Sequence, residues 1–306
     1  MRTTKTLWQA ITVLFCLQPL LSACGANGLG SSGGLVEERM MLPAQFKAED
    51  GSSYTANLDT LVIRPDDGAK HPLAVVNMGI STLLHDEIHP DLMRDQTREF
   101  ARRGWVAVTF TRRGWGHSEG AYDESITKCD TAEYLRIGRR AAEDIHEVVR
   151  LMDERPYVDA SKLIVIGYTG GGTIAVSADP PPGLAAVIMF AGTGGLSISC
   201  PRKIVDQAFA TYGSTSKAPS LWIHAENDYV HPEKLILIEF NNFTKAGGNG
   251  ELLRAPAFHN DGAGLFMSEG IPVWTHYVDD FLDKNGLKLR DGLIDAGNGY
   301  AATTDR

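Results

Sequence analysis

Residues 162–176 read KLIVIGYTGGGTIAV, and this stretch decides the fold. Residues 162–166 form a short apolar run of the kind that a buried parallel strand shows. Residues 167–171, Gly-Tyr-Thr-Gly-Gly, form a glycine-flanked turn, and residues 172–176 are able to open a helix of small side chains. The stretch therefore predicts a strand, a tight turn and a helix, with Thr169 in the middle of the turn.

The same alternation of strands and helices runs through most of the chain. It predicts the α/β class, with a mostly parallel central sheet and helices on both faces. Near the start, residues 44–47 and 54–64 are expected to pair as an antiparallel hairpin. The other expected strands are residues 73–77, 105–110, 184–190, 219–224 and 251–258, and the other expected helices are residues 90–103, 131–152, 203–212, 231–246 and 272–285.

The first two dozen residues have the pattern of an export signal. Arg2 and Lys5 form a basic start, and the apolar run over residues 7–21 is too short for a membrane-spanning helix. The run ends in Leu-Ser-Ala before Cys24, which resembles the lipobox of bacterial lipoproteins. We therefore expect a signal peptide over residues 1–23 and a lipid on Cys24. An ordinary secretory signal, with Cys24 incidental, is the alternative.

Behind the signal, the chain is expected to divide into a tether, one domain and a tail. Residues 24–38 begin with a run rich in Gly, Ser and Asn and are expected to be a flexible tether. Residues 39–286 are long enough for one α/β domain with a full core. Residues 287–306 are polar and contain glycine, so a loose C-terminal tail is expected. The expected location is the periplasm or cell envelope, with the lipid on Cys24 as the membrane anchor.

Charge and cysteine usage narrow the class of partner. The chain has 306 residues, a net charge of −9 and no basic cluster, which argues against nucleic acid as a partner. No His or Cys spacing indicates a metal site. Cys129 and Cys200 remain once the cysteines of the signal are set aside. In an exported chain a disulfide between them is expected, and two buried free thiols are the alternative.

An acidic residue follows another expected strand. Asp228 lies just past residues 219–224, in the turn Glu-Asn-Asp. A strand–turn–helix unit of the G-x-S-x-G type is a nucleophile elbow, and its partners follow in the chain order nucleophile, acid, histidine. Asp228 fits the acid, which would hold an imidazole in the right tautomer and stabilise its charged form. A helix-capping role before Pro232 is the alternative.

Several stretches together carry a family resemblance. They are residues 112–120 (RRGWGHSEG), the G-Y-T-G-G elbow, residues 221–228 (LWIHAEND) and residues 257–266 (AFHNDGAGLF), followed by Trp274 and Phe281-Leu282. From about residue 40 to 285 the chain resembles a dienelactone-hydrolase-like member of the α/β-hydrolase superfamily. The resemblance implies the α/β-hydrolase fold, hydrolysis of esters or lactones, a small-molecule ester, lactone or related ligand, and no cofactor. Cys129 and Cys200 also lie where similar exported proteins tend to have cysteines.

The chain departs from the family pattern at three positions of the site. Relatives carry serine at the position of Thr169, histidine at the position of Ala263 in D-G-H-x-L-F, and often H-G where this chain has Met78-Gly79. An elbow forces its central residue towards positive φ, which strains a β-branched side chain. Losing one triad member typically removes several orders of magnitude of rate. The departures therefore indicate a degraded catalytic triad.

His259 is the candidate substitute for the missing base. It stands four residues before Ala263, directly after the last expected strand, and a remodelled loop would bring it to the other two triad positions. The alternative is a surface histidine at the mouth of the pocket. His117 and His231 are weaker candidates, because each fits a turn or a helix start.

The oxyanion hole needs only backbone N–H groups and can outlast the triad. Gly170 would supply one donor, and Gly79 or Ile80 the other. Arg112 and Arg113 would be able to hold a ligand carboxylate as a fork. Arginines in such a turn more often brace loops, and bracing is the default expectation.

Two functions of different classes therefore stay open. One is a hydrolase homologue that is weakly active or inactive and binds a small molecule in the old pocket. The other is an active carboxylic-ester hydrolase with a rearranged triad of Thr169, His259 and Asp228. Ser118 is a further hydroxyl in the R-R-G-x-G-x-S turn, but nothing in the sequence places a base beside it.

Overall fold

The computed structural model describes residues 28–32, 34–48, 50–79, 85–170, 180–192 and 200–295. Its strands are β1 (Gly28–Ser32), β2 (Leu35–Lys47), β3 (Ser53–Pro65), β4 (His71–Met78), β5 (Val106–Phe110), β6 (Val158–Tyr168), β7 (Leu184–Phe190), β8 (Ser220–Ala225) and β9 (Gly250–Ala255). Its α-helices are α1 (Arg94–Arg102), α2 (Thr131–Asp153), α4 (Arg202–Thr215), α5 (Glu233–Lys245) and α6 (Ile271–Lys284). Short 3-10 turns are η1 (His85–Glu87), η2 (Pro90–Met93), η3 (Gly262–Phe266) and η4 (Ser268–Gly270). The helix expected over residues 172–176 lies outside the described residues.

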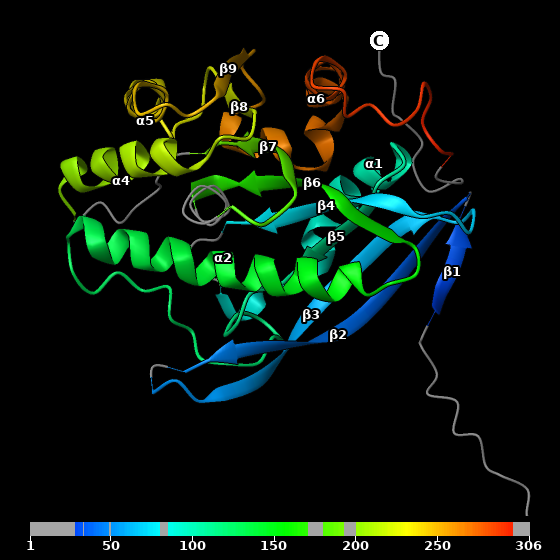
Figure 1. Cartoon of the computed structure of the whole chain (residues 1–306). Coiled ribbons are helices and arrows are strands. Elements are labelled where there is room, and N and C mark those ends of the chain that lie inside the picture. Colours follow the sequence, from blue (N-terminus) through cyan, green and yellow to red (C-terminus); the bar gives the residue numbers. More distant parts are fainter. Residues whose placement is uncertain are drawn as a thin grey trace, which may run out of the picture.

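The strands form one twisted sheet in the order β1-β2-β3-β5-β4-β6-β7-β8-β9 (Figure 1). β5, β4, β6, β7, β8 and β9 pair in parallel. β1, β2 and β3 join that block through antiparallel pairs, and β2 and β3 form a long hairpin. The predicted hairpin and the mostly parallel sheet are confirmed.

Apolar side chains cover both faces of the sheet. On one face α2, α4 and α5 pack over a core that includes Tyr134, Phe209 and Trp222. On the other face α1 and α6 pack over a core that includes Phe100 and Trp274 (Figure 1). Because the central strands are buried on both faces, they read as continuous apolar runs in the sequence and do not alternate. The predicted helices on both faces are confirmed.

Two elements are shorter than expected beside a proline. β9 ends at Ala255, because Pro256 has no N–H to donate to a ladder. α5 begins at Glu233, after Pro232. His231 was expected to start that helix and lies instead in the loop before it.

The flexible tether predicted over residues 24–38 is wrong where the structure describes it. β1 and the start of β2 are strands, and Leu35 is buried in the core. Glu37 is also buried and accepts hydrogen bonds from Arg94 and Arg98 of α1. This strand was not predicted because a glutamate normally indicates an exposed position, and its burial depends on two arginines that lie about 60 residues further along the chain.

The loose tail predicted from residue 287 is wrong for residues 287–295. Leu287 is buried against the core under α6. The N–H of Ile294 donates to the carbonyl of Arg102 at 2.8 Å, and the Arg102 Nε donates to the carbonyl of Ile294 at 3.1 Å. The scattered leucines of this polar segment are the signal in the sequence for its packing. Residues 296–306 lie outside the described residues.

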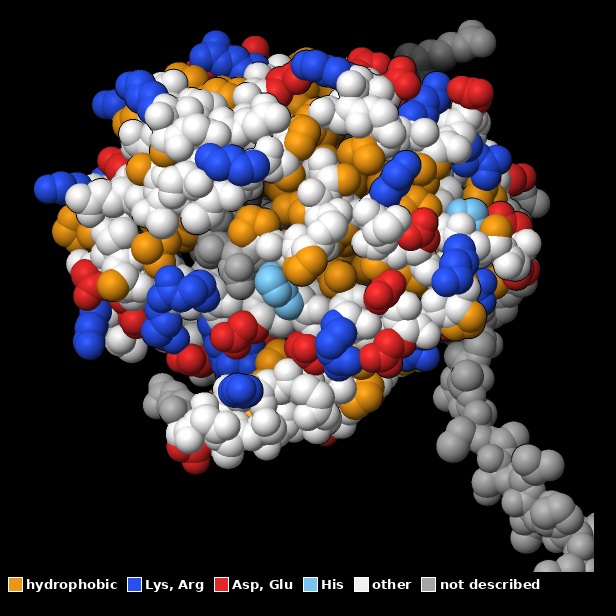
Figure 2. Space-filling model, in the orientation of Figure 1, with side chains coloured by type: hydrophobic (Ala, Val, Ile, Leu, Met, Phe, Trp, Pro, Cys, Tyr) orange, Lys and Arg blue, Asp and Glu red, His pale blue; other side chains and the backbone are white. Residues whose placement is uncertain are grey.

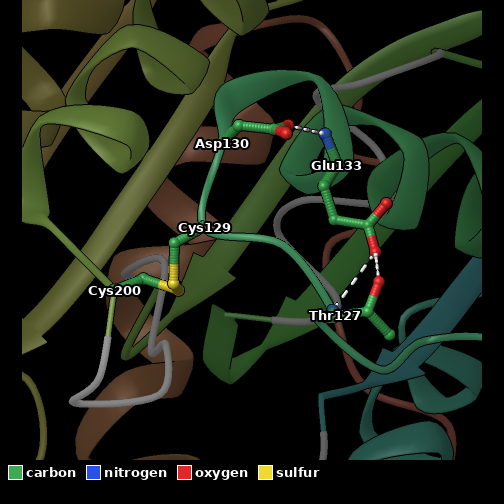
Figure 3. Close-up of a disulfide and its surroundings, with 5 residues drawn as sticks. All are labelled: Thr127, Cys129, Asp130, Glu133 and Cys200. Carbon is green, nitrogen blue, oxygen red and sulfur yellow. Dashed lines mark hydrogen bonds between the residues drawn. A yellow bond between two sulfur atoms is a disulfide. The ribbon is translucent and has the colours of Figure 1, made fainter.

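The predicted disulfide between Cys129 and Cys200 is confirmed, with Cα atoms 5.2 Å apart (Figure 3). It lies at the N-termini of α2 and α4, which cover the same face of the sheet. Asp130 caps α2 by accepting the N–H of Glu133, and the Glu133 carboxylate accepts the hydroxyl of Thr127 (Figure 3). The loop that carries Cys129 is thus fixed by a covalent bond and by a helix cap.

Charges of both signs are interspersed over the face of the molecule drawn in Figure 2, with apolar side chains between them. Such mixing creates no single-sign field on that face. In the part of the chain that the structure describes, no helix combines the length and apolar character needed to cross a membrane. The same part contains no group of three or more His, Cys, Asp or Glu side chains suited to a metal ion.

Candidate active site

The turn after β6 has the backbone geometry of a nucleophile elbow. Thr169 has a φ of 57°, in the left-handed region that is strained for a β-branched residue. The turn leaves the middle of the sheet, because β6 pairs with β4 on one side and β7 on the other. Thr169 is half-buried and Gly170 is buried. The positive φ expected at this position is confirmed.

One candidate oxyanion donor is already engaged. The N–H of Gly79 donates to the carbonyl of Tyr168 at 2.6 Å, which extends the pairing of β4 and β6 by one residue. This bond removes Gly79 from the predicted oxyanion hole, because one N–H cannot also point at a ligand. Ile80, the other candidate on this side, lies outside the described residues. Gly170 directly follows Thr169, and its N–H stays a predicted oxyanion donor.

The two arginines of the R-R-G turn brace the loops beside the elbow. Arg112 is buried and donates to both carboxylate oxygens of Glu124, at 2.6 and 2.8 Å. The same guanidinium donates to the carbonyl of Met78 at 2.6 Å, at the end of β4. Arg113 is buried and pairs with Asp144. Both side chains are committed to protein partners, so the expected bracing role is confirmed.

Ser118 is also committed to the scaffold. Its hydroxyl donates to the carbonyl of Thr111 at 2.5 Å and accepts the N–H of Asp59 at 2.9 Å. The side chain therefore ties the turn to β3 and is not presented as a nucleophile.

Asp228 lies three residues past β8, at the same carboxyl edge of the sheet as the elbow. Its side chain is fully buried. Oδ1 accepts the backbone N–H of His231 at 2.7 Å, and Oδ2 lies 3.1 Å from His231 Nδ1. α5 has Pro232 at its N-cap and no side-chain cap, so the alternative role of Asp228 as a helix cap is wrong. Asp228 is thus a buried acid with an imidazole partner, and that partner is His231, a weaker candidate than His259 from the sequence.

His259 does not meet the other members of the proposed rearranged triad. Its side chain is 60% exposed, and its Nδ1 lies 3.2 Å from Oε2 of Glu269. The ring stacks on Phe258 with centroids 4.0 Å apart. Among the described residues, no hydrogen bond or ion pair joins His259 to Thr169 or Asp228. The loop was expected to curl inward, but a φ of 46° at His259 turns the chain so that the ring lies along the surface.

Ala263 lies in η3, where the missing histidine of the family pattern would be. Its carbonyl accepts the hydroxyl of Tyr168 at 3.1 Å. Burial, together with the nearby carboxylates of Asp228 and Asp261, raises the pKa of Tyr168 to about 12. Tyr168 therefore places a neutral phenol between the elbow and η3. This role of Tyr168 was not predicted from the sequence, in which its place directly before Thr169 is the available signal.

Comparison with known proteins agrees with this architecture. A protein-family model described as "Dienelactone hydrolase family" matches residues 58–252, from β3 into β9, which is more than half of the chain. No curated protein sequence matches the chain significantly.

Solved structures of hydrolases share the fold. The putative dienelactone hydrolase from Klebsiella pneumoniae subsp. pneumoniae MGH 78578 is similar with a TM-score of 0.55 at 17% identity, over 81% of this chain and 98% of that chain. Thermogutta terrifontis esterase 2 with bound butyrate gives a TM-score of 0.55 at 18% identity, over 82% and 97%. The Pyrococcus furiosus esterase Pf2001 gives 0.53 at 16%, over 84% and 92%. At these identities the likeness shows the α/β-hydrolase fold.

Proposed function

Because this chain belongs to the dienelactone hydrolase family, we propose that its elbow pocket binds a small ester, lactone or related molecule and hydrolyses it weakly or not at all. The observation that carries the proposal is a retained elbow beside a vacant base position. Thr169 has the elbow's positive φ, whereas residue 263 is alanine. Such an elbow still offers a backbone N–H to a ligand carbonyl, but an alanine side chain at position 263 cannot take the proton from the threonine hydroxyl as a histidine would.

The chemistry of the ligand follows from the family and from one relative. Thermogutta terrifontis esterase 2 has been solved with bound butyrate, a short acyl chain. A small acyl compound is accordingly the ligand class proposed for this chain. The hydroxyl of Thr169 and the N–H of Gly170 are the polar groups that would meet its carbonyl.

An active carboxylic-ester hydrolase is the weaker candidate. It would need a base within about 3 Å of the Thr169 hydroxyl. His259, proposed for that role, is 60% exposed and paired with Glu269. The retained strain at Thr169 is the one observation in favour of this candidate, because strain of this kind concentrates at functional sites.

The protein without its first 23 residues and its Thr169→Ala variant are expected to hydrolyse p-nitrophenyl butyrate equally slowly, near the rate in buffer. A hydroxyl that lacks a histidine at the triad position is a weak nucleophile at neutral pH. Initial rates at matched concentration decide the point. A parent rate that falls about tenfold or more in Thr169→Ala would contradict the proposal and favour the active hydrolase.

Ligand binding is tested separately, by thermal unfolding of the parent protein. Butyrate or γ-butyrolactone at millimolar concentration should raise its melting temperature, and no shift with either compound would refute the proposed binding.

We also propose that the mature chain is an exported lipoprotein anchored through Cys24. The sequence of residues 1–24 supports the proposal, as does the Cys129–Cys200 disulfide, because disulfides persist in oxidising compartments. Expression of the full chain in a bacterial host with labelled palmitate should label the parent protein and leave Cys24→Ser unlabelled. Label in both proteins, or in neither, would contradict lipidation at this residue.

A further inference from the structure

Asp228 makes its hydrogen bonds within its own turn. The backbone N–H of His231 donates to Oδ1, and the ring of the same residue meets Oδ2 through Nδ1 at 3.1 Å. In a catalytic triad, the acid accepts the N–H of the imidazole that serves the nucleophile. Here the imidazole comes from three residues downstream and not from the loop after β9.

The Asp228–His231 pair is closed to solvent. The side chain of His231 is 3% exposed and that of Asp228 is not exposed at all. A second buried imidazole, that of His224 on β8, has its Nδ1 3.8 Å from the same oxygen, Oδ2. Burial lowers the pKa of His224, although Asp228 opposes the shift, so His224 is neutral near pH 7. Two imidazoles of the described chain thus approach Oδ2.

The loop after β9 still lies beside the turn of Asp228, but it makes contact through other groups. The N–H of Tyr229 donates to Oδ1 of Asp261 at 3.3 Å. The carbonyl of Ala263 is occupied by the hydroxyl of Tyr168. Within the described ranges, the amide of Asn227 and the carboxylate of Asp261 join the two loops, and no imidazole does so.

We propose that His231 is the positioning residue for Asp228, and that the pair fixes the turn carrying Tyr229 and Val230 and does not support a base beside Thr169. Tyr229 and Val230 are 73% and 62% exposed, which is high for large apolar side chains. The two buried contacts between Asp228 and His231 hold the turn that displays them at the carboxyl edge of the sheet. The inference rests on the proposed function, because it gives Asp228 a structural role in a site where the expected triad histidine is replaced by Ala263.

The proposal predicts that restoring the two family residues does not by itself restore the triad. We compare Thr169→Ser/Ala263→His with two variants that add a change at His231. His231→Val removes the side-chain donor, whereas His231→Asn places an amide N–H close to the position of Nδ1 and keeps the bond to Oδ2. The variant with valine is expected to exceed both the double variant and the variant with asparagine by about tenfold or more in kcat/KM on p-nitrophenyl butyrate. Equal values in all three proteins, at any level, would overturn the proposal.

A second measurement on the unaltered protein does not depend on the folding of any variant. The ¹⁵N chemical shifts of the His231 ring should show a proton on Nδ1 near pH 7, because that nitrogen faces a carboxylate. An unprotonated Nδ1 would overturn the proposal. These two measurements test only the role of His231. The proposed function is tested separately, by the hydrolysis rates of the parent protein and of Thr169→Ala.

Discussion

Removing the Cys129–Cys200 disulfide with the double change Cys129→Ser/Cys200→Ser is expected to lower the free energy of unfolding by about 4 kcal/mol. The bond spans 71 residues, so breaking it frees a long loop in the unfolded chain. That loop contains β6, the elbow and β7. In the folded state the bond joins the starts of α2 and α4, which are further linked by the hydroxyl of Thr131 on Gln207 at 2.8 Å. Equilibrium urea unfolding of the two proteins measures the difference.

The single changes Cys129→Ser and Cys200→Ser serve as the matched controls. Each should lose about as much stability as the double variant, because either one removes the same bond. A reducing agent should destabilise the parent protein by a similar amount and leave the double variant unaffected. A loss under about 1 kcal/mol in the double variant would show that the unfolded chain is not the state that the disulfide constrains.

Replacing Arg112 with methionine is expected to cost about 3–5 kcal/mol of folding free energy. The side chain of Arg112 is 2% exposed and that of Glu124 is 10% exposed, and the change leaves this carboxylate without its charged partner. It also strands the carbonyl of Met78, which accepts from Arg112 at 2.6 Å, and the amide oxygen of Asn77, which accepts at 3.1 Å. Those two residues end β4 directly beside the elbow, so the proposed binding of a ligand at the elbow should weaken as well.

The same substitution at an exposed arginine is the control. Arg150 is 46% exposed and donates to Glu147 and Glu154 on the surface of α2. Arg150→Met should change the free energy of unfolding by less than about 1 kcal/mol, because water screens exposed pairs. If Arg112→Met were equally mild, the pair of Arg112 and Glu124 would contribute no more than a surface ion pair. Adding Glu124→Leu to Arg112→Met should recover part of the loss, because it removes the unpaired charge.

The sequence predicted the places of Thr169 and Asp228 in the fold better than it predicted their contacts. Both residues lie just after apolar runs that end at the carboxyl edge of the parallel part of the sheet. His259 was chosen for its distance along the chain from Ala263, but its φ of 46° and its pairing with Glu269 direct the ring outward. Neither property is written in the residue types of that loop.

The two errors at the ends of the domain have a common cause. The segment that contains Glu37 was predicted to be a flexible tether, and the segment with scattered leucines was predicted to be a loose tail. Each is buried by a partner far away in the chain, Glu37 by two arginines of α1 and Leu287 by the core under α6. Burial of a single charged residue or of isolated apolar residues leaves no periodic pattern in the sequence. The polar, glycine-containing composition of both segments therefore led to the wrong prediction.

By itself the sequence determined the parallel sheet, the helices on both faces, the tight turn at Thr169 and the alanine at position 263, because these follow from apolar runs, glycines and residue identity. Only the tertiary structure decided which imidazole meets Asp228 and whether the N–H of Gly79 is free. Spacing along the chain permits His231 and His259 alike. The choice between them depends on the direction in which each side chain leaves its loop, and that direction is set by packing between strands that are distant in the sequence.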